Sequence, residues 1–321
     1  MQTILAVTVP FFALVLAGWW AARRHVLPES AIPGLNVFVL YFALPCMLLR
    51  FGLATPIAQL LNPLVLAVHL VCALLLVFFI IAITLGGRIG IKDAAFGAMV
   101  GAFPNSGFMG VPMLIALLGA PAAGPLICCI LVDIFITSSL CIALAEAGSG
   151  GGGMRAAAAR ALRGTLGNPL PWAIALGAAG SVLGFKPSGP VDTVIRMLAD
   201  AATPVALFTI GAVLYRAGQH AHGRTPLAQV LPVTLIKRLL HPLLVVAAAA
   251  IAAAAGAPMT PLQFTVLVLN AALPSAANVS ILAERYGADN GRIARIILAT
   301  TVGAFGSFTL IAWGLGVQGL G

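Results

Sequence analysis

The sequence predicts an all-α integral membrane protein, and its composition, its apolar segments and its loop charges all support this. Of the 321 residues, 61% are hydrophobic and 8% are charged, and the mean hydropathy is +1.10. Several segments hold about 20 apolar residues in succession, which is the length that an α-helix needs to cross a bilayer core. This composition excludes a soluble domain, and we expect a polytopic chain surrounded by the lipid bilayer.

Ten apolar segments are expected to span the membrane. They are residues 3–22, 30–53, 61–85, 94–119, 124–146, 170–185, 191–215, 228–255, 262–284 and 292–318. Arg23 and Arg24 follow the first apolar run and no basic residue precedes it, which is the reverse of the charge order in a cleavable signal peptide. We therefore expect the first segment to be retained as a span.

Basic residues predict the orientation of these spans. The connections after the first, third, fifth, seventh and ninth spans carry Arg23, Arg24, Arg88, Lys92, Arg155, Arg160, Arg163, Arg216, Arg224, Arg285, Arg292 and Arg295. The opposite side has only Arg50, Lys186 and Arg196 near it. Positive loops stay in the cytoplasm, so both termini are expected outside the cell, with the protein in the bacterial plasma (inner) membrane. The net charge of +9 then reports topology, and no nucleic-acid partner is expected.

The chain is expected to divide into two halves, 1–147 and 168–321, joined by a glycine-rich, basic cytoplasmic linker at 148–167. Each half would hold five spans. Because five is an odd number, the second half must enter the membrane upside down relative to the first, as in the inverted repeats of secondary transporters. Prolines in corresponding spans support this: Pro45 and Pro104 in the first half match Pro204 and Pro274 in the second.

Spans four and nine are expected to be broken at these prolines, in "GAFPNSGFMG" and "NAALPSAANVS". A break frees backbone groups that must be buried in protein or face a polar cavity. Each half-helix that follows a break presents its N-terminus near the bilayer midplane, where it attracts anions. The expected substrate-binding residues are Pro104, Asn105, Ser106, Gly107, Pro274, Ser275 and Asn278. Neither break contains a carboxylate, which argues against a carrier of cations built around acidic crossover residues.

Six ionisable residues inside the predicted spans are candidates for coupling or for structural ion pairs, because buried charges are usually paired or functional. They are His69, Asp133, Asp200, Lys237, Arg238 and His241. We expect at least one acid, with Asp133 as the first choice, to exchange a proton or a basic partner during function. The alternative for Asp133 is a permanent ion pair with Lys237 or Arg238, and the sequence does not separate the two.

No cofactor and no metal ion is expected. The five cysteines lie inside apolar runs without a CxxC pair, and His220 and His222 have no further ligands at metal spacing. An enzyme is not expected either, because "FPNSG" departs from the GxSxG pattern of hydrolases and no HExxH occurs.

Two motifs, "FPNSGFMGVPML" and "ALPSAANVSILAERYG", resemble the crossover motifs of the auxin efflux carrier family in its short bacterial form. The resemblance covers nearly the whole chain. It implies ten helices as two inverted five-helix repeats, similar to bile acid sodium symporters and sodium/proton antiporters, with an elevator-type movement and often a homodimer. It also implies that Pro104, Asn105, Pro274 and Asn278 line the substrate site, and that the substrate is a small organic anion such as malonate, malate or an auxin-like acid.

The expected function is therefore secondary active transport of small carboxylates across the membrane. A passive anion channel or uniporter remains the alternative, because half-helices that attract anions can also line a pore. The sequence leaves open which carboxylate is carried, and whether protons, sodium ions or neither drive it.

Overall fold

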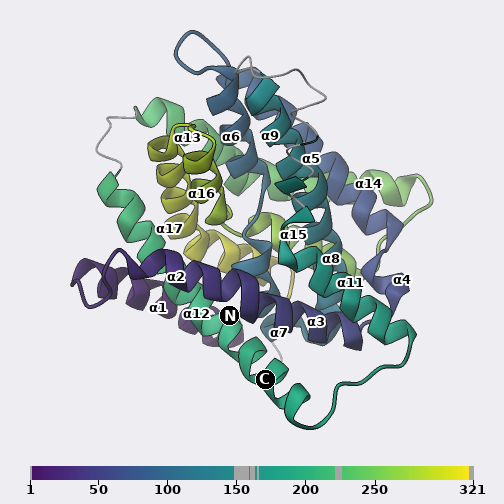
Figure 1. The fold of residues 1–321 in the computed structure, drawn as a ribbon. Coiled ribbons are helices and arrows are strands. Elements are labelled where there is room, and N and C mark those ends of the chain that lie inside the picture. Colours follow the sequence, from purple (N-terminus) through teal and green to yellow (C-terminus); the bar gives the residue numbers. More distant parts are fainter. Residues whose placement is uncertain (1, 148–158, 160–162, 165, 221–225, 318–321) are drawn as a thin grey trace.

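The computed structural model describes residues 2–147, 159, 163–164, 166–220 and 226–317, and within these ranges the elements are helices, with no β-strand (Figure 1). Seven helices are long and apolar enough to cross a membrane, and three shorter apolar helices cover 106–118, 169–182 and 261–272. The protein is thus an all-α membrane protein, whereas the count of ten spans stays a prediction. Most of the expected linker lies outside the described residues.

The helices of the first half share a pattern of long apolar segments with short interruptions. They are α1 (Gln2–Arg23), α2 (Ala31–Phe38), η1 (Val39–Ala43), α3 (Leu44–Ala54), α4 (Ile57–Leu60), α5 (Pro63–Thr84), α6 (Ile91–Ala102), η2 (Ser106–Gly110), α7 (Val111–Leu118), η3 (Ala120–Ala122), α8 (Ala123–Val132), η4 (Asp133–Thr137) and α9 (Ser138–Ala147). The elements η1, η2 and η4 are π-helical, and η3 is a 3₁₀-helix.

The second half is also built from apolar helices. It comprises α11 (Pro169–Val182), α12 (Gly189–His220), α13 (Leu227–Leu235), the π-helical η5 (Ile236–Leu240), α14 (His241–Ala254), α15 (Pro261–Ala272), α16 (Asn278–Arg285) and α17 (Asn290–Gly314). Several starts follow directly from the sequence. Asn62 and Asn168 accept hydrogen bonds from the first turns of α5 and α11, and Thr260 forms a capping box with Gln263 at the start of α15. In all three helices proline follows the cap, where its missing N–H is harmless.

One set of helices, here called the panel group, consists of α1, α2, η1, α3, α11 and α12. Within it α1 packs on α12, and α3 packs on α11 and α12. Glycines make this packing close: a Cβ atom at Gly211 would overlap the carbonyl oxygen of Val15, and one at Gly18 would overlap that of Phe208. Gly52 and Gly177 bring α3 and α11 together in the same way. Small residues at such crossings let membrane helices approach backbone to backbone.

The remaining long helices form a second set, the core group, made of α5 to α9 and α13 to α17 with their π-helical segments. Arg292 ties three of these elements together although it is only 1% exposed. Its Nε donates to the Gln229 carbonyl of α13 at 3.1 Å, and its Nη1 donates to the Asp93 carbonyl of α6 at 3.0 Å. The two groups meet where α1 and α12 contact α17, α7 and η2.

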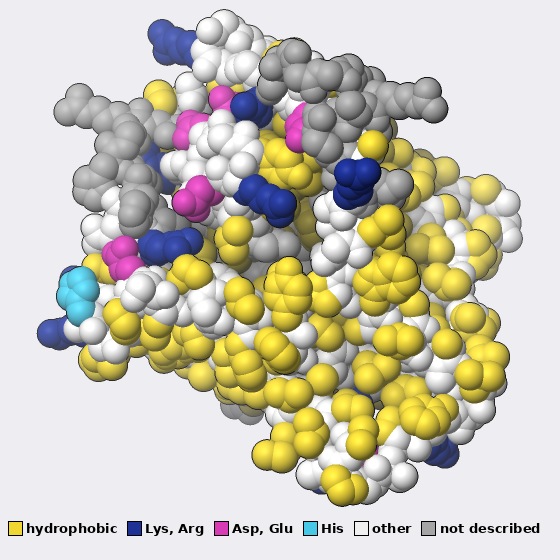
Figure 2. All heavy atoms as spheres, in the orientation of Figure 1, with side chains coloured by type: hydrophobic (Ala, Val, Ile, Leu, Met, Phe, Trp, Pro, Cys, Tyr) yellow, Lys and Arg dark blue, Asp and Glu magenta, His cyan; other side chains and the backbone are white. Residues whose placement is uncertain are grey.

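Charged side chains are unevenly placed on the surface. Figure 2 shows that, on the face it presents, acidic and basic side chains gather at one end, above a broad apolar surface. An apolar belt of this kind suits contact with lipid.

Candidate functional site at the helix breaks

The first break lies between α6 and η2. The α-helix ends at Ala102, residues 103–105 are not helical, and η2 begins at Ser106. Pro104 cannot donate a backbone hydrogen bond, and proline disfavours the helical conformation of the residue before it, so the break falls where the sequence predicted it. The second break follows the same logic: α15 ends at Ala272 and α16 begins at Asn278, with Pro274 between them.

The two breaks pair with one another. The Asn105 N–H donates to the Pro274 carbonyl at 2.9 Å, and the Ala276 N–H donates to the Phe103 carbonyl at 3.0 Å, so that Pro104 and Ser275 lie opposite each other as an isolated antiparallel bridge. Backbone groups freed by one break thus satisfy groups freed by the other. Figure 1 shows the two extended segments passing through the middle of the core group. We call this place the crossover.

Buried polar side chains surround the crossover. The Ser106 hydroxyl donates to Asn270 Oδ1 at 2.7 Å, and the Ser275 N–H donates to Thr300 Oγ1 at 3.2 Å. Two further buried atoms, Asn270 Nδ2 and Ser275 Oγ, have no hydrogen-bond partner among the described residues. An unsatisfied buried polar group is unfavourable by roughly 1 to 3 kcal/mol. The crossover therefore offers an amide and a hydroxyl that an incoming ligand can satisfy.

The other predicted crossover residues occupy different positions. Asn105 is buried, and its carbonyl accepts from the N–H groups of Met109 and Gly110 in η2. Asn278 is the first residue of α16 and is partly exposed. A Cβ atom at Gly107 would meet no atom within 4 Å, so there is open space beside η2, which also contacts α12.

Two basic residues approach the crossover from η5. Arg238 Nη1 donates to the Thr300 carbonyl at 3.3 Å, and Lys237 Nζ donates to the Ala271 carbonyl at 3.2 Å. Thr300 bonds Ser275, and Ala271 lies in the last turn of α15. A cation at a helix C-terminus offsets the partial negative charge there. Lys237 lies at such a helix end, whereas Arg238 bonds a carbonyl in the middle of α17. The two positive charges together make the surroundings of the second break favourable to an anion.

Four of the six ionisable residues expected inside spans come together as one buried cluster: His69 of α5, Asp133 of η4, Lys237 of η5 and His241 of α14. Each is at most 1% exposed. His69 Nε2 lies 3.0 Å from Asp133 Oδ1, and Lys237 Nζ lies 3.0 Å from His241 Nδ1. The two imidazole ring centroids are 6.5 Å apart. Asp133 thus has His69 as its hydrogen-bonded partner, rather than the Lys237 or Arg238 that the sequence suggested.

The other two candidates lie apart from this cluster. Arg238 turns toward α17, as described above. Asp200 pairs instead with Arg50 across α12 and α3, with 3.6 Å between Oδ1 and Nη1, and the two side chains are 71% and 42% exposed. Position within an apolar segment therefore did not distinguish a buried acid from an exposed one.

Two cavities lie between the panel group and the core group. One, of about 550 Å³, is bounded by α1, α3, α12 and α7, and it contains Arg50 and Asp200. The other, of about 390 Å³, is bounded by α2, α12, α16 and Asn290. On α12, Thr203 lines the first and Val213 the second, which places them about 15 Å apart along the helix. Each cavity thus abuts the half-helix that follows one of the two breaks.

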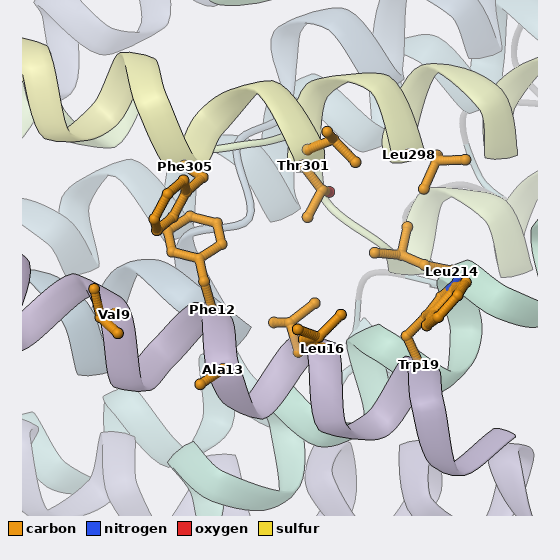
Figure 3. A pocket seen from close by; sticks show the side chains of 11 residues that line it. Val9, Phe12, Ala13, Leu16, Trp19, Leu214, Leu298, Thr301 and Phe305 are labelled. Carbon is orange, nitrogen blue, oxygen red and sulfur yellow. The ribbon is translucent and has the colours of Figure 1, made fainter. Parts of the chain in front are cut away.

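A third cavity is apolar and lies between α1, α12 and α17. It has a volume of about 490 Å³, and Figure 3 shows Phe12 of α1 facing Phe305 of α17 at one end and Trp19 near Leu214 at the other. The two phenyl rings are 5.1 Å apart, edge to face. No charged side chain lines it, so it does not suit a carboxylate.

Sequence reasoning missed Asn270 and Thr300. Asn270 lies four residues before Pro274, inside the quoted "NAALPSAANVS". Its position one helical turn before the break was the signal that could have identified it. Thr300 lies in an uninterrupted apolar helix, α17, and nothing in its surrounding sequence marks it as a partner of Ser275.

Broken helices paired within an apolar bundle, with a cavity beside each half-helix, are an arrangement typical of membrane transport proteins. The sequence profile of the family described as "Membrane transport protein" matches residues 3–312. The chain belongs to this family, which confirms the resemblance to auxin efflux carriers.

Two similar proteins carry names that agree with this family. One from Rhizobium meliloti, named "Putative malonate transporter", is 30% identical over 308 residues, covering 94% of this chain and 92% of the relative. One from Methanothermobacter thermautotrophicus, named "Uncharacterized transporter", is 27% identical over 315 residues, covering 94% of this chain and 93% of the relative.

Proposed function

We propose that the protein is a secondary active transporter of small carboxylates, bound as anions at the crossover and carried by an elevator-type movement. The observation that carries this proposal is the set of unsatisfied buried groups at the crossover, Asn270 Nδ2 and Ser275 Oγ, next to Arg238 and Lys237. Pro104, Asn105, Ser106, Gly107, Pro274, Ser275 and Asn278 complete the proposed site. The name of the Rhizobium relative makes malonate the first substrate to test.

An anion is favoured over a cation on electrostatic grounds. The residues that touch the crossover in the described structure are amides, hydroxyls and two basic side chains, and the nearest acid in the buried cluster is already bonded to His69. Amides and hydroxyls can donate to carboxylate oxygens, and bonds to charged groups contribute about 1.5 to 3 kcal/mol each.

The arrangement of the two helix groups supports alternating access. In the panel group, α1 (span one) pairs with α12 (span seven), and α11 (span six) pairs with α3 (span two). These two pairs are equivalent if spans one to five correspond to spans six to ten. Each of the two cavities abuts one half-helix that follows a break, α7 or α16, and this agrees with such a correspondence. We propose that the core group slides against the panel group, so that the crossover opens to one cavity and then to the other.

Orientation is part of the same proposal. The loop charges support a cytoplasmic linker, outside termini and an inner-membrane location, which puts the cavity with Glu29 and Glu284 on the cytoplasmic side. A cysteine introduced at Gly151 should react with a membrane-impermeant thiol reagent only from the cytoplasm. Reaction from outside would reverse the assignment of the two cavities. The resemblance to the family also supports a homodimer.

Reconstitution distinguishes a carrier from a channel. Purified protein in liposomes should exchange labelled malonate against a panel of unlabelled carboxylates, with uptake that saturates and that is stimulated by substrate on the opposite side. Uptake that never saturates, without counterflow, would indicate a passive anion channel. Absence of any carboxylate movement would contradict the proposed substrate class.

A further inference from the structure

We propose that the buried cluster of His69, Asp133, Lys237 and His241 is a proton site coupled to the crossover, and that the protein carries one proton together with one substrate anion. This rests on the proposed function, because it assumes an anion at the crossover. It adds which ion is coupled to the substrate and which residues bind that ion. It also adds that the ion and the substrate bind together rather than displace one another.

The cluster has the atoms that a proton site needs. Asp133 Oδ2 is buried and has no hydrogen-bond partner among the described residues, so it can take up a proton without breaking an existing bond. His241 Nδ1 accepts from the Lys237 ammonium group, so the neutral His241 ring already carries its proton on Nε2. The 3.0 Å contact between His69 Nε2 and Asp133 Oδ1 lets these two groups share a proton. A sodium ion needs several oxygen ligands, whereas the groups around Asp133 are an imidazole, an ammonium group and the Thr137 hydroxyl, 3.5 Å away.

Charge balance sets the sign of the coupling. With Lys237 positive, Asp133 negative and both imidazoles neutral, the cluster carries no net charge, which suits a site at most 1% exposed. A bound proton makes the cluster positive by one unit. An uncompensated charge in the membrane interior is unfavourable, and a substrate anion close by offsets it. Proton and anion should therefore bind together rather than displace one another.

Lys237 connects the two sites physically. Its Nζ contacts both His241 Nδ1, at 3.0 Å, and the Ala271 carbonyl, at 3.2 Å. Ala271 precedes Pro274 by three residues, a span of at most about 10 Å of chain. Opposite unit charges about 10 Å apart, at an effective dielectric constant of about 20, alter each other's binding by about tenfold. By linkage, the proton strengthens anion binding by the same factor as the anion strengthens proton binding.

Other titratable groups on the packed elements do not replace the cluster. Cys129 lies beside His69, and the further thiols on α5, α8 and α9 are Cys72, Cys128 and Cys141. Thiols ordinarily stay neutral below about pH 8. Arg238 is directed toward Thr300. The remaining charges on the described parts of these elements are Lys92 and Asp93 in the first turn of α6, Glu146 in the last turn of α9, and Arg292 and Arg295 in the first two turns of α17.

The test uses the full-length protein in liposomes, with malonate as the probe and the membrane potential held at zero by potassium and valinomycin. In the parent protein, an inside-alkaline gradient of one pH unit should drive about tenfold accumulation of malonate, beyond that in protein-free liposomes. Asp133→Asn keeps the side-chain shape and removes the charge. It should retain malonate exchange and lose gradient-driven accumulation, while Asp192→Asn, the same change in the panel group, should behave as the parent.

Two results would overturn the proposal. One is accumulation in Asp133→Asn that follows the gradient as in the parent. The other is a parent protein that exchanges malonate yet ignores the gradient, which leaves the proposed function intact as a uniporter. If Asp133→Asn does not fold, His69→Gln serves as the second cluster variant, and the measurement on the parent needs no variant. A parent that exchanges no carboxylate would reject the proposed function and this inference together.

Discussion

The panel group and the core group differ in what fills the contacts between their helices. In the panel group, glycines such as Gly18 and Gly211 let backbones touch, and the ion pair on its surface, between Arg50 and Asp200, is exposed. In the core group, contacts run through buried polar side chains, including Arg292 and the cluster around Asp133. One group is held by close backbone packing and the other by buried polar contacts, some of whose atoms have no partner among the described residues.

This difference matters because the two kinds of contact respond differently to change. Close backbone packing tolerates no added atom but is indifferent to pH, whereas a buried polar network depends on its protonation state and on every partner being present. A panel held by backbone packing beside a core of polar contacts would suit the elevator-type movement proposed above. The predictions below test each side of this division, starting with the largest effect.

The largest effect is expected where the panel group has no space. Gly211→Leu would drive a side chain into the Val15 carbonyl and the Trp19 N–H, so α1 and α12 would have to separate. Because the obstacle is backbone, we expect loss of most folded protein, measured as the monodisperse fraction in detergent and its thermal unfolding. At Gly218, on the same helix, an added Cβ would meet no described atom within 4 Å, so Gly218→Leu should fold normally. Equal behaviour of the two variants would contradict the close packing.

The next effect belongs to the crossover, and it should appear in function rather than in folding. Asn105→Ala or Asn278→Ala removes an amide donor, a loss of roughly 1 to 3 kcal/mol, or about ten- to a hundredfold in substrate affinity. Malonate binding by the purified variants and exchange in liposomes would measure it, with thermal unfolding as the check on folding. If both variants bind and exchange malonate as the parent does, the substrate lies elsewhere.

The two helix breaks were predictable from the sequence because their cause is local. Proline removes a donor and clashes with the preceding turn, and at Pro104 and Pro274 small polar residues follow it. Pro204, in a different sequence context, lies inside the continuous helix α12. The caps at Asn62, Asn168 and Thr260 are local in the same sense. Long apolar runs likewise identify membrane helices without knowledge of their neighbours.

The partners of buried charges could not be predicted, because they depend on which helices pack together. His69 and Asp133 are 64 residues apart, and Lys237 reaches Ala271 across 34 residues. Neither separation has a sequence signature. The π-helical segments η4 and η5 add to the difficulty, since an extra residue in a turn changes the face on which Asp133 and Lys237 emerge. Thr300 and the glycine contacts of the panel group were missed for the same reason.

The smallest effect is expected for the exposed ion pair of the panel group. Asp200 and Arg50 are 3.6 Å apart, and the carboxylate side chain is 71% exposed, so solvent screens their attraction. Exposed pairs contribute about 0 to 1 kcal/mol, whereas removing one partner from a buried pair is unfavourable by about 3 to 5 kcal/mol. Asp200→Ala should therefore leave thermal unfolding in detergent nearly unchanged, while Asp133→Ala should lower the unfolding temperature clearly. If Asp200→Ala lowered the unfolding temperature as much as Asp133→Ala, the Arg50–Asp200 pair would have to be shielded from water in the folded protein. The exposed acid of the panel group would then contribute as much as the buried acid of the core group, and the proposed contrast between the two groups would be wrong.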